Sequence, residues 1–359
     1  MLKRSLHFSS APTTRSPLAL VLAGVALIAG TYGMARFGVG LLHPQMAAAR
    51  PGLDGALRPA GTAQFASYCL AVLVGGRLAR TRARHVALAA GVVAGAGALG
   101  LMLAQTSATF TVAAFVAGAG AGLASPALVP LLDRAVPTER SGLTQAAVNS
   151  GTAVGLVVVG TVVLLTSAVV TPWVMVAVVC VGAGWAVRAL APPSPDVGPG
   201  PAARVGGLPR AARTMALPWL LAAAAGGVSA YVWTYGPSVV VQGTGLGTDQ
   251  VGWLWVAVGA GGLMGVVAGR VVELTSPLLA FLACSAGVLL ATALVSGATH
   301  LGPAVLGLVL FGAAYMALTG TLILWGRVLR PEDAGRATAW LFLAVSVGQA
   351  VGTALVGPS

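Results

Sequence analysis

Long apolar runs recur along the whole of this sequence, and they constrain its fold more than any other feature. Eleven windows are long and apolar enough to cross a hydrocarbon layer of about 30 Å. Inside a bilayer the backbone polar groups must be satisfied within each segment, so these windows predict membrane-spanning helices. The windows lie at about residues 18–42, 60–79, 85–105, 108–131, 143–166, 170–190, 215–241, 250–270, 277–297, 301–326 and 335–357.

The composition excludes a soluble globular protein. Hydrophobic residues make up 57% of the 359 positions and charged residues only 8%, which is too little polar surface to cover a globule in water. A net charge of +12 can indicate nucleic-acid binding, but here the basic residues lie in short loops between apolar runs. We therefore expect an all-α polytopic membrane protein that contacts the lipid bilayer and binds no nucleic acid.

The sequence offers no chemistry typical of an enzyme. Cys69, Cys180 and Cys284 lie inside apolar runs without CxxC or Cys/His spacing, which favours small buried side chains over a disulfide framework or a zinc site. The stretch GAGALG at 95–100 matches GxGxxG, but it lies in a predicted span and follows no strand, so we interpret it as packing glycine. We predict no catalytic residue, no metal site, no cofactor and no enzyme activity.

The basic residues set the expected orientation. If the amino end is cytoplasmic, alternating loops place Arg50 and Arg58 outside, and place Lys3 and the other loop arginines inside. The first apolar run is longer than the about 7–15 residues of a signal-peptide core, so we predict a span instead of a signal peptide. Arginine greatly outnumbers lysine, and alanine and glycine abound, as in products of GC-rich bacterial genomes, which favours the cytoplasmic cell membrane.

A stretch rich in Pro and Gly at 191–213 divides the predicted spans into two groups. We expect a cytoplasmic tail at 1–17, a six-helix bundle at 18–190, a cytoplasmic linker at 191–213 and a five-helix bundle at 214–359. When the two groups of spans are aligned with each other, identical residues recur without a change of register. This predicts a parallel internal repeat, with two bundles related by an axis along the membrane normal. A shift of 193 positions aligns Gly76-Arg77 with Gly269-Arg270, Arg134 with Arg327, Gly142 with Gly335 and Gly155 with Gly348.

Several stretches resemble a known family. The loops GGRLARTRARH and DRAVPTERSG, the central linker and the last run, RPEDAGRATAWLFLAVSVGQAVGTAL, resemble the major facilitator superfamily. Within it, YGMARFGVGLLHPQM is similar to the YbfB/YjiJ-type branch. The resemblance implies two helical bundles that work by alternating access on a small-molecule solute, and we expect a monomer. Such proteins usually have twelve spans, so we expect that the twelfth is missing here, through truncation or because it is dispensable.

The resemblance also implies residues that control opening between the bundles. The superfamily loop pattern, roughly GxLaDRxGRR, follows the second span, but Arg80 stands where the pattern has an aspartate. The matching place in the second half holds Glu273, and Asp133 could pair with Arg80 or Arg77. The implied gating residues are Gly76, Arg77, Arg80, Arg84, Asp133, Gly269, Arg270 and Glu273.

Arg36 is the most unusual residue of the first span, because its permanent charge lies in an apolar helix. A central arginine costs about 2.5–3.5 kcal/mol on insertion scales, and the aliphatic residues of the span recover about 2–4 kcal/mol. At helical spacing Tyr32 and His43 share its stripe, which we expect to face protein or a water-filled cavity. Two interpretations stay open: Arg36 reaches the outer interface or pairs structurally, or it binds an anionic or carbonyl-bearing solute.

Other polar residues recur at helical spacing within the predicted spans. Each of them is open to two interpretations, an interhelical hydrogen bond or a wall of the solute site. Trp233, Trp253 and Trp255 lie near the expected outer face and are interpreted as interfacial anchors. Together with Arg36, the candidate substrate-binding residues are Tyr32, Gln64, Gln145, Asn149, Tyr231, Tyr235, Tyr315 and Gln349.

No Asp or Glu lies in the middle of a predicted span. Proton-coupled carriers commonly titrate such a carboxylate, so a buried carboxylate relay is disfavoured and the coupling ion stays open. We predict a membrane transporter that moves a small, anionic or polar organic solute by alternating access. The alternative is a non-transporting membrane sensor or assembly subunit on the same scaffold, and solute flux into proteoliposomes distinguishes the two.

Overall fold

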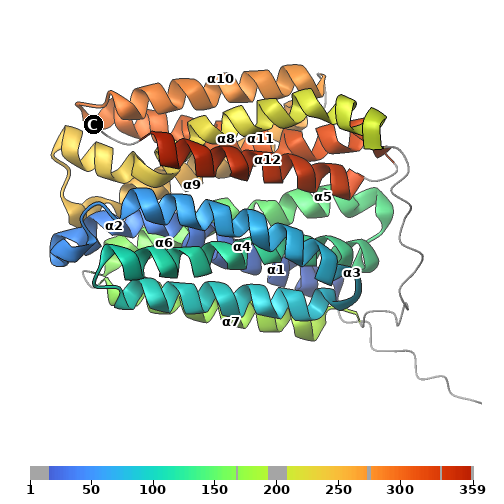
Figure 1. The fold of residues 1–359 in the computed structure, drawn as a ribbon, viewed down its shortest axis with the longest axis horizontal. Coiled ribbons are helices and arrows are strands. Elements are labelled where there is room, and N and C mark those ends of the chain that lie inside the picture. Colours follow the sequence, from blue (N-terminus) through green and yellow to red (C-terminus); the bar gives the residue numbers. More distant parts are fainter. Residues whose placement is uncertain (1–15, 167–168, 193–207, 273–275, 332–333, 357–359) are drawn as a thin grey trace, which may run out of the picture.

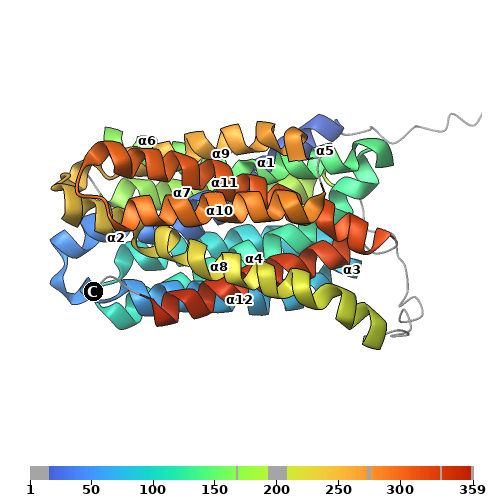
Figure 2. The same ribbon diagram turned by 90° about the horizontal axis from the view of Figure 1, so that it is seen from above.

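The computed structural model describes residues 16–166, 169–192, 208–272, 276–331 and 334–356, and its long helices run side by side along the longest axis of the molecule (Figures 1 and 2). Within these residues the secondary structure is helical, so the predicted all-α polytopic fold is confirmed. The elements are α1 (Pro17–Ile28), η1 (Ala29–Arg36), α2 (Phe37–Ala49), η2 (Pro51–Leu53), α3 (Leu57–Leu103), α4 (Ser107–Ala135), α5 (Thr138–Asn149), α6 (Gly151–Leu165), α7 (Val170–Leu190), α8 (Leu208–Thr244), η3 (Thr248–Gln250), α9 (Gly252–Val272), α10 (Pro277–Ser296), α11 (Leu301–Leu329) and α12 (Ala334–Leu355).

These helices account for the predicted spans. In the described part of the chain, nine helices are long and apolar enough to cross a membrane. One of them, α3, has 47 residues, and at 1.5 Å per residue it is about twice as long as a bilayer core is thick. Its backbone leaves the helical region at Arg82 (φ −128°, ψ 33°), inside the predicted loop between the second and third spans. α3 therefore contains two predicted spans.

Two helix starts show how local chemistry sets a boundary. The side chain of Ser276 accepts a hydrogen bond from the Leu279 N–H at 3.3 Å, and Pro277 follows as the first residue of α10. A capping hydroxyl and a proline in the first turn both favour a helix start, as the sequence predicts here. α8, in contrast, begins at Leu208, so the last residues of the predicted linker at 191–213 are helical.

The outer surface is apolar, as a bilayer requires. Large hydrophobic side chains are exposed on many helices, among them Leu22, Val112, Val178, Leu220 and Leu290. In water such a surface would be costly, whereas lipid acyl chains cover it without cost. We call the end of the molecule with the α2–α3 connection the Arg50 end and the opposite end, with the break in α3, the Arg84 end; they lie left and right in Figure 1.

The helices α1 to α7, here called the first half, lie below those of the second half, α8 to α12, in Figure 1. A close glycine contact inside the first half has a counterpart inside the second half, 193 positions later in the sequence. A Cβ at Gly33 would meet the Thr152 carbonyl oxygen, and a Cβ at Gly226 would meet the Val345 carbonyl oxygen. Both residues of the second contact lie 193 positions after those of the first, so the packing agrees with the predicted repeat.

Contacts between the halves extend from the level of Arg36 towards the Arg50 end. The rings of Phe37 in α2 and Trp233 in α8 stack with centroids 3.7 Å apart. Nearer that end, Gln45 Nε2 donates to the Thr248 carbonyl oxygen at 2.8 Å. A Cβ at Gly61 in α3 would lie 2.6 Å from Cγ2 of Thr353 in α12. The two halves are therefore closely packed between Arg36 and the Arg50 end.

The tryptophans correct one expectation. Trp233 and Trp255 are buried, and their rings stack 5.4 Å apart within the second half, so the interpretation as interfacial anchors is wrong for both. Trp253 is 61% exposed, as an anchor would be. The reason is helical geometry, because two residues of α9 that are two positions apart point to nearly opposite faces.

Candidate functional site

The first span changes its helical pitch where Arg36 lies. Residues Ala29–Arg36 form the π-helix η1, in which the N–H of Phe37 lies against the carbonyl oxygen of Tyr32, five residues before it. Short π-helical segments inside α-helices are rare and often occur at functional sites. Arg36 is only 2% exposed and lines a cavity with Tyr32. The interpretation in which Arg36 reaches the membrane interface is therefore wrong.

Aromatic rings surround the Arg36 guanidinium. Its Cζ lies 4.3 Å from the ring centroid of Tyr68, 4.8 Å from Phe65, 5.2 Å from Phe37 and 5.6 Å from Tyr32. We call these four residues the ring cluster. A cation over aromatic faces gains about 0.5–1 kcal/mol at exposed sites and about 2 kcal/mol when it is desolvated. The ring cluster therefore favours a charged Arg36 in this buried place.

The hydrogen-bond partners of Arg36 are neutral and come from the second half. Its Nη2 donates to Oε1 of Gln349 at 2.9 Å and to Oγ of Ser346 at 3.5 Å. Its Nε is buried and has no hydrogen-bond partner among the residues that the structure describes. In the described part of the chain no carboxylate contacts Arg36. A buried charge without an ion pair is energetically costly, so this arrangement needs a reason beyond packing.

Gln349 connects Arg36 to two further helices. Its Nε2 donates to the Tyr315 hydroxyl at 3.0 Å and to Oγ of Ser229 at 3.3 Å. Arg36, Ser229, Tyr315 and Gln349 belong to η1, α8, α11 and α12. Ser229 stands 193 positions after Arg36 and is its counterpart in the internal repeat. The amide of Gln349 is thus held between two residues that correspond in the two halves.

A small cavity of about 30 Å³ lies beside Arg36 between the halves. One water needs roughly 10–15 Å³ of such volume, so the space holds about two waters. The wall mixes charge, hydroxyl and amide groups with apolar side chains, as in sites for small polar ligands. It is formed by Tyr32, Arg36, Phe37, Tyr68, Asn149, Thr152, Tyr315, Met316, Thr319, Phe342, Val345 and Ser346.

Further hydrogen bonds order the polar wall. The Tyr32 hydroxyl lies 2.7 Å from Oγ of Ser125 and donates to the Tyr68 hydroxyl at 3.0 Å. Asn149 Nδ2 donates to Oγ1 of Thr319 at 3.2 Å, which joins the two halves a second time. The amide contacts of Gln349 and Asn149 therefore connect the halves at this level without an acidic residue.

The structure brings together five of the nine candidate substrate-binding residues. Tyr32, Arg36, Asn149 and Tyr315 line the cavity, and Gln349 bonds to Arg36 and Tyr315. These five candidates therefore lie around one point between the halves.

The other four candidates lie outside the cavity wall. Gln64 is buried in α3, where its backbone meets Gly118 of α4. Gln145 is half-buried in α5. Tyr231 and Tyr235 have ring centroids 5.8 Å apart, and the Tyr235 hydroxyl donates to the Thr353 carbonyl oxygen at 3.2 Å. These contacts suit interhelical hydrogen bonds and packing.

Five of the eight implied gating residues lie at the Arg84 end. Gly76, Arg77 and Arg80 are exposed on α3, and Asp133 is exposed on α4. Arg84 contacts its own half, because its Nε and Nη2 donate to the Arg188 carbonyl oxygen of α7 at 3.0 and 2.7 Å. For Gly269 and Arg270 in α9 the structure describes the backbone only, and Glu273 lies outside the described residues.

Sequence reasoning missed five hydroxyl residues at the site: Ser125, Thr152, Ser229, Thr319 and Ser346. Single Ser and Thr residues are common in membrane helices and carry little information by themselves. Two signals were nevertheless available. Ser346 precedes Gln349 by three positions and so shares its helical face, and Ser229 corresponds to Arg36 in the repeat.

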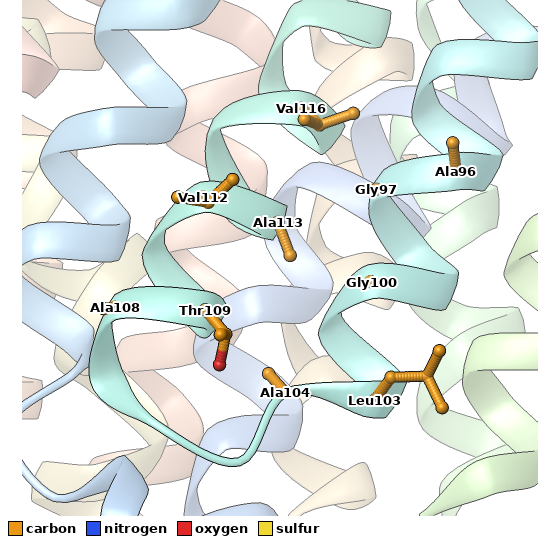
Figure 3. Close-up of a pocket in the computed structure, with 10 residues that line it drawn as sticks. All are labelled: Ala96, Gly97, Gly100, Leu103, Ala104, Ala108, Thr109, Val112, Ala113 and Val116. Atoms are coloured by element: carbon orange, nitrogen blue, oxygen red, sulfur yellow. The ribbon is translucent and has the colours of Figure 1, made fainter.

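A larger cavity of about 590 Å³ lies between α3 and α4 (Figure 3). Its wall consists of small and aliphatic residues, and the hydroxyl of Thr109 is engaged with Thr106. Leu103 and Val112 are largely exposed, which places this cavity on the surface that faces the bilayer. Within the residues that the structure describes, no group of three or more His, Cys, Asp or Glu residues could hold a metal ion.

Comparison with solved structures identifies transporters of the same fold. The nucleoside transporter NupG, solved as a mutant, superimposes with a TM-score of 0.72 at 10% identity, and the match covers 94% of this chain and 90% of that one. A bacterial homolog of the human lysosomal transporter Spinster, inward-facing and unoccupied, gives 0.69 at 14% identity over 96% and 82%. The D-xylose-proton symporter gives 0.67 at 18% identity over 94% and 88%.

Sequence comparison gives the family itself. No curated protein matches the chain significantly. The profile of the Major Facilitator Superfamily, however, matches residues 18–353, which is nearly the whole chain. The helical halves, their repeat and the central cavity between them agree with this match, and the chain therefore belongs to the Major Facilitator Superfamily.

Proposed function

We propose that this protein is a membrane transporter that moves a small, anionic or polar organic solute by alternating access. The two halves rock about the cavity beside Arg36, which opens first to one side of the membrane and then to the other. Structural neighbours that carry nucleosides and D-xylose support a transport role over an enzymatic one. The stretch YGMARFGVGLLHPQM supports a finer placement in the YbfB/YjiJ-type branch.

One observation carries the proposal: Arg36 is a buried cation with no carboxylate partner among the described residues, and it faces a polar cavity between the halves. Ionisable residues inside a membrane protein are costly and are retained mainly where they act. A structural arginine would be expected to have an acidic partner. Here the charge faces a small polar cavity between the two halves, which would widen as they separate.

The proposal includes the place and the moving parts of the transporter. We place it in the cytoplasmic membrane with a cytoplasmic amino end, on the distribution of arginines. The moving bodies are the bundles at 18–190 and 214–359, connected by the linker at 191–213. We propose a monomer, because the solute site uses side chains from both halves of one chain.

The test is flux in proteoliposomes. Purified protein is reconstituted, and uptake of radiolabelled organic anions and neutral polar metabolites is measured for the wild type, Arg36→Gln and Arg188→Gln. Arg188 is exposed at the end of α7, so Arg188→Gln is the matched control. Uptake of at least one solute should be lost in Arg36→Gln and kept in Arg188→Gln. Equal uptake by the Arg36 variant would remove this residue from the site.

The alternative function is a membrane sensor or assembly subunit on the same scaffold. Neutral contacts such as Asn149–Thr319 could hold two states of a sensor as well as two states of a transporter. Binding of a solute by purified protein together with absence of flux would favour this alternative.

A further inference from the structure

We infer that the solute carries a single carboxylate, which binds side-on to Nε and Nη2 of Arg36 and displaces the side-chain oxygen of Gln349. This inference rests on the proposed function, because it names the solute class of that same site. Three observations carry it: a half-occupied edge of the guanidinium, the charge of the site, and the way in which Gln349 is held.

The first observation is the state of the Arg36 donors. Nε and Nη2 form one edge of the guanidinium, and their N–H bonds point in the same direction. Nη2, which carries two N–H bonds, donates to Gln349 Oε1 at 2.9 Å and to Ser346 Oγ at 3.5 Å, whereas Nε is buried and donates to nothing among the described residues. A single amide oxygen satisfies one donor of this edge. The two oxygens of a carboxylate satisfy both, with the parallel geometry that arginine and carboxylate favour.

The second observation is the charge of the site. Among the residues that line the cavity, Arg36 is the one ionised at neutral pH, since the others are tyrosines, neutral polar and apolar residues. One positive charge is neutralised by one negative charge, whereas a dianion would bring a second charge into a low-dielectric space without compensation. The site therefore suits a monoanion, and the apolar side chains of the cavity wall, such as Met316, Phe342 and Val345, suit an apolar group beside the carboxylate.

The third observation explains why Gln349 can be displaced. Its Nε2 remains bonded to Tyr315 and Ser229 in the second half, so the side chain keeps two partners when Arg36 is taken by a solute. In this structure the Gln349 oxygen accepts from the Nη2 donor that a solute oxygen would take. Solute binding thus exchanges a bond between the halves for a bond to the solute, which links occupancy to their movement.

A test without any solute follows from this geometry. Gln349→Glu places a carboxylate of nearly the same shape against Arg36, and a double-mutant cycle combines it with Arg36→Gln. We expect Gln349→Glu to raise the thermal unfolding midpoint of the solubilised protein above that of the wild type. In the Arg36→Gln background the same change should lower the midpoint, because the new charge is then buried without a partner.

The matched control is Gln64→Glu. Gln64 is buried in α3, and its Oε1 has no hydrogen-bond partner in the described part of the chain. The same substitution there introduces a negative charge that no donor is placed to bind. This variant should lower the midpoint. The inference is overturned if Gln349→Glu lowers the midpoint as much as Gln64→Glu does. It is also overturned if Gln349→Glu lowers the midpoint equally in the wild type and in the Arg36→Gln background.

A second test uses small probes on the purified protein. Formate, acetate, propionate and benzoate are compared with the corresponding amides, with methanesulfonate and with inorganic phosphate. At least one carboxylate should raise the unfolding midpoint of the wild type, its amide should not, and the effect should be absent in Gln349→Glu, whose own carboxylate occupies Arg36. Protection by none of the carboxylates, equal protection by amides, or protection only by phosphate or methanesulfonate overturns the inference.

The two proposals can fail separately. If flux of a neutral solute depends on Arg36 and no carboxylate raises the unfolding midpoint, the transport function is supported and the carboxylate inference is overturned. Protection by a carboxylate through Arg36, with no flux of that carboxylate in proteoliposomes, keeps the carboxylate site and overturns transport.

Discussion

At the scale of single residues, the function depends on how the charge of Arg36 is kept in a buried place with no carboxylate partner among the described residues. Arg36 relies on the ring cluster and on two neutral acceptors from α12. Each of these contacts is weaker than an ion pair, and together they leave Nε unpaired among the described residues. A site that is stable but incomplete in this way favours binding of a further acceptor, which is what a carrier requires.

The contribution of the rings can be measured at Tyr68, whose centroid lies 4.3 Å from Arg36 Cζ. Tyr68→Phe removes the hydroxyl that accepts from Tyr32 but keeps an aromatic face for Arg36. Tyr68→Leu removes that face as well. We expect Tyr68→Leu to lower stability by about 2 kcal/mol more than Tyr68→Phe, as for a desolvated cation over a ring. Thermal unfolding of the solubilised variants measures the difference, and equal midpoints for both would contradict the role of the ring.

The residue scale also shows the limit of sequence reasoning about the site. Arg36 can be recognised from the sequence because a charge in an apolar run is unusual, and Gln349 because an amide there is unusual. Ser346 and Ser229 contact these two residues but look like ordinary small residues of a membrane helix. Their role follows from the packing of α8 and α12, which no local pattern of one segment encodes.

At the scale of elements, the π-helix η1 decides which residues of the first span meet. The stripe predicted from α-helical spacing joins Arg36 with His43, seven residues later. In the structure, Nε2 of His43 lies 3.1 Å from the Leu53 carbonyl oxygen, and its ring packs on Phe110. η1 brings Tyr32 and Arg36 to the same cavity, but it ends at Arg36. His43 follows in the α-helix α2, and at 1.5 Å per residue it lies about 10 Å further along the axis, away from the cavity. Fold prediction is unaffected, because it needs only the length and apolarity of the span.

Glycines set the distance between the first and fifth spans of each half. A Cβ at Gly155 would meet the Ala29 carbonyl oxygen, and a Cβ at Gly348, its repeat counterpart, would meet the Ala223 carbonyl oxygen. Gly348→Ala and Gly155→Ala must therefore separate helices or shift their backbones. We expect each to lower stability by about 1–3 kcal/mol, as other overpacking changes do.

The control for this prediction is Gly182→Ala in α7, where nothing in the described part of the chain lies within 4 Å of the added Cβ. Alanine favours helix over glycine by about 1 kcal/mol, so this variant should be as stable as the wild type or more stable. Unfolding of the three variants by heat gives the comparison. Similar midpoints for Gly348→Ala and Gly182→Ala would mean that α8 and α12 are not held at contact distance by glycine.

At the scale of the whole molecule, much of the architecture could be predicted and the interface between the halves could not. The apolar runs are dictated by the bilayer, which is a uniform solvent with a fixed thickness, so each run predicts a helix with little ambiguity. Which faces of those helices meet depends on contacts between distant segments. For this reason the sequence suggests a membrane-interface position for Trp233 and Trp255, yet both are buried and their rings stack on each other.

The closed Arg50 end gives the last prediction. In this conformation the stack of Phe37 on Trp233 and the bond from Gln45 to Thr248 lie between Arg36 and that end. A solute can cross from one side of the membrane to the other only if these contacts separate during each transport cycle. A covalent bridge between Gln45 and Thr248 positions should therefore stop transport even though it touches no residue of the solute site.

The experiment uses Gln45→Cys with Thr248→Cys in a chain whose Cys69, Cys180 and Cys284 are replaced by Ala. The control pair is Arg50→Cys with Ala104→Cys, since Arg50 Nη1 donates to the Ala104 carbonyl oxygen at 2.8 Å within the first half at the same end. After treatment with a short bifunctional thiol reagent, we expect flux to fall to background in the first pair and to persist in the second. Mass spectrometry verifies that both bridges have formed. Flux that continues through a fully bridged first pair would show that the halves do not separate at this end, and rocking of the two halves would then be the wrong mechanism.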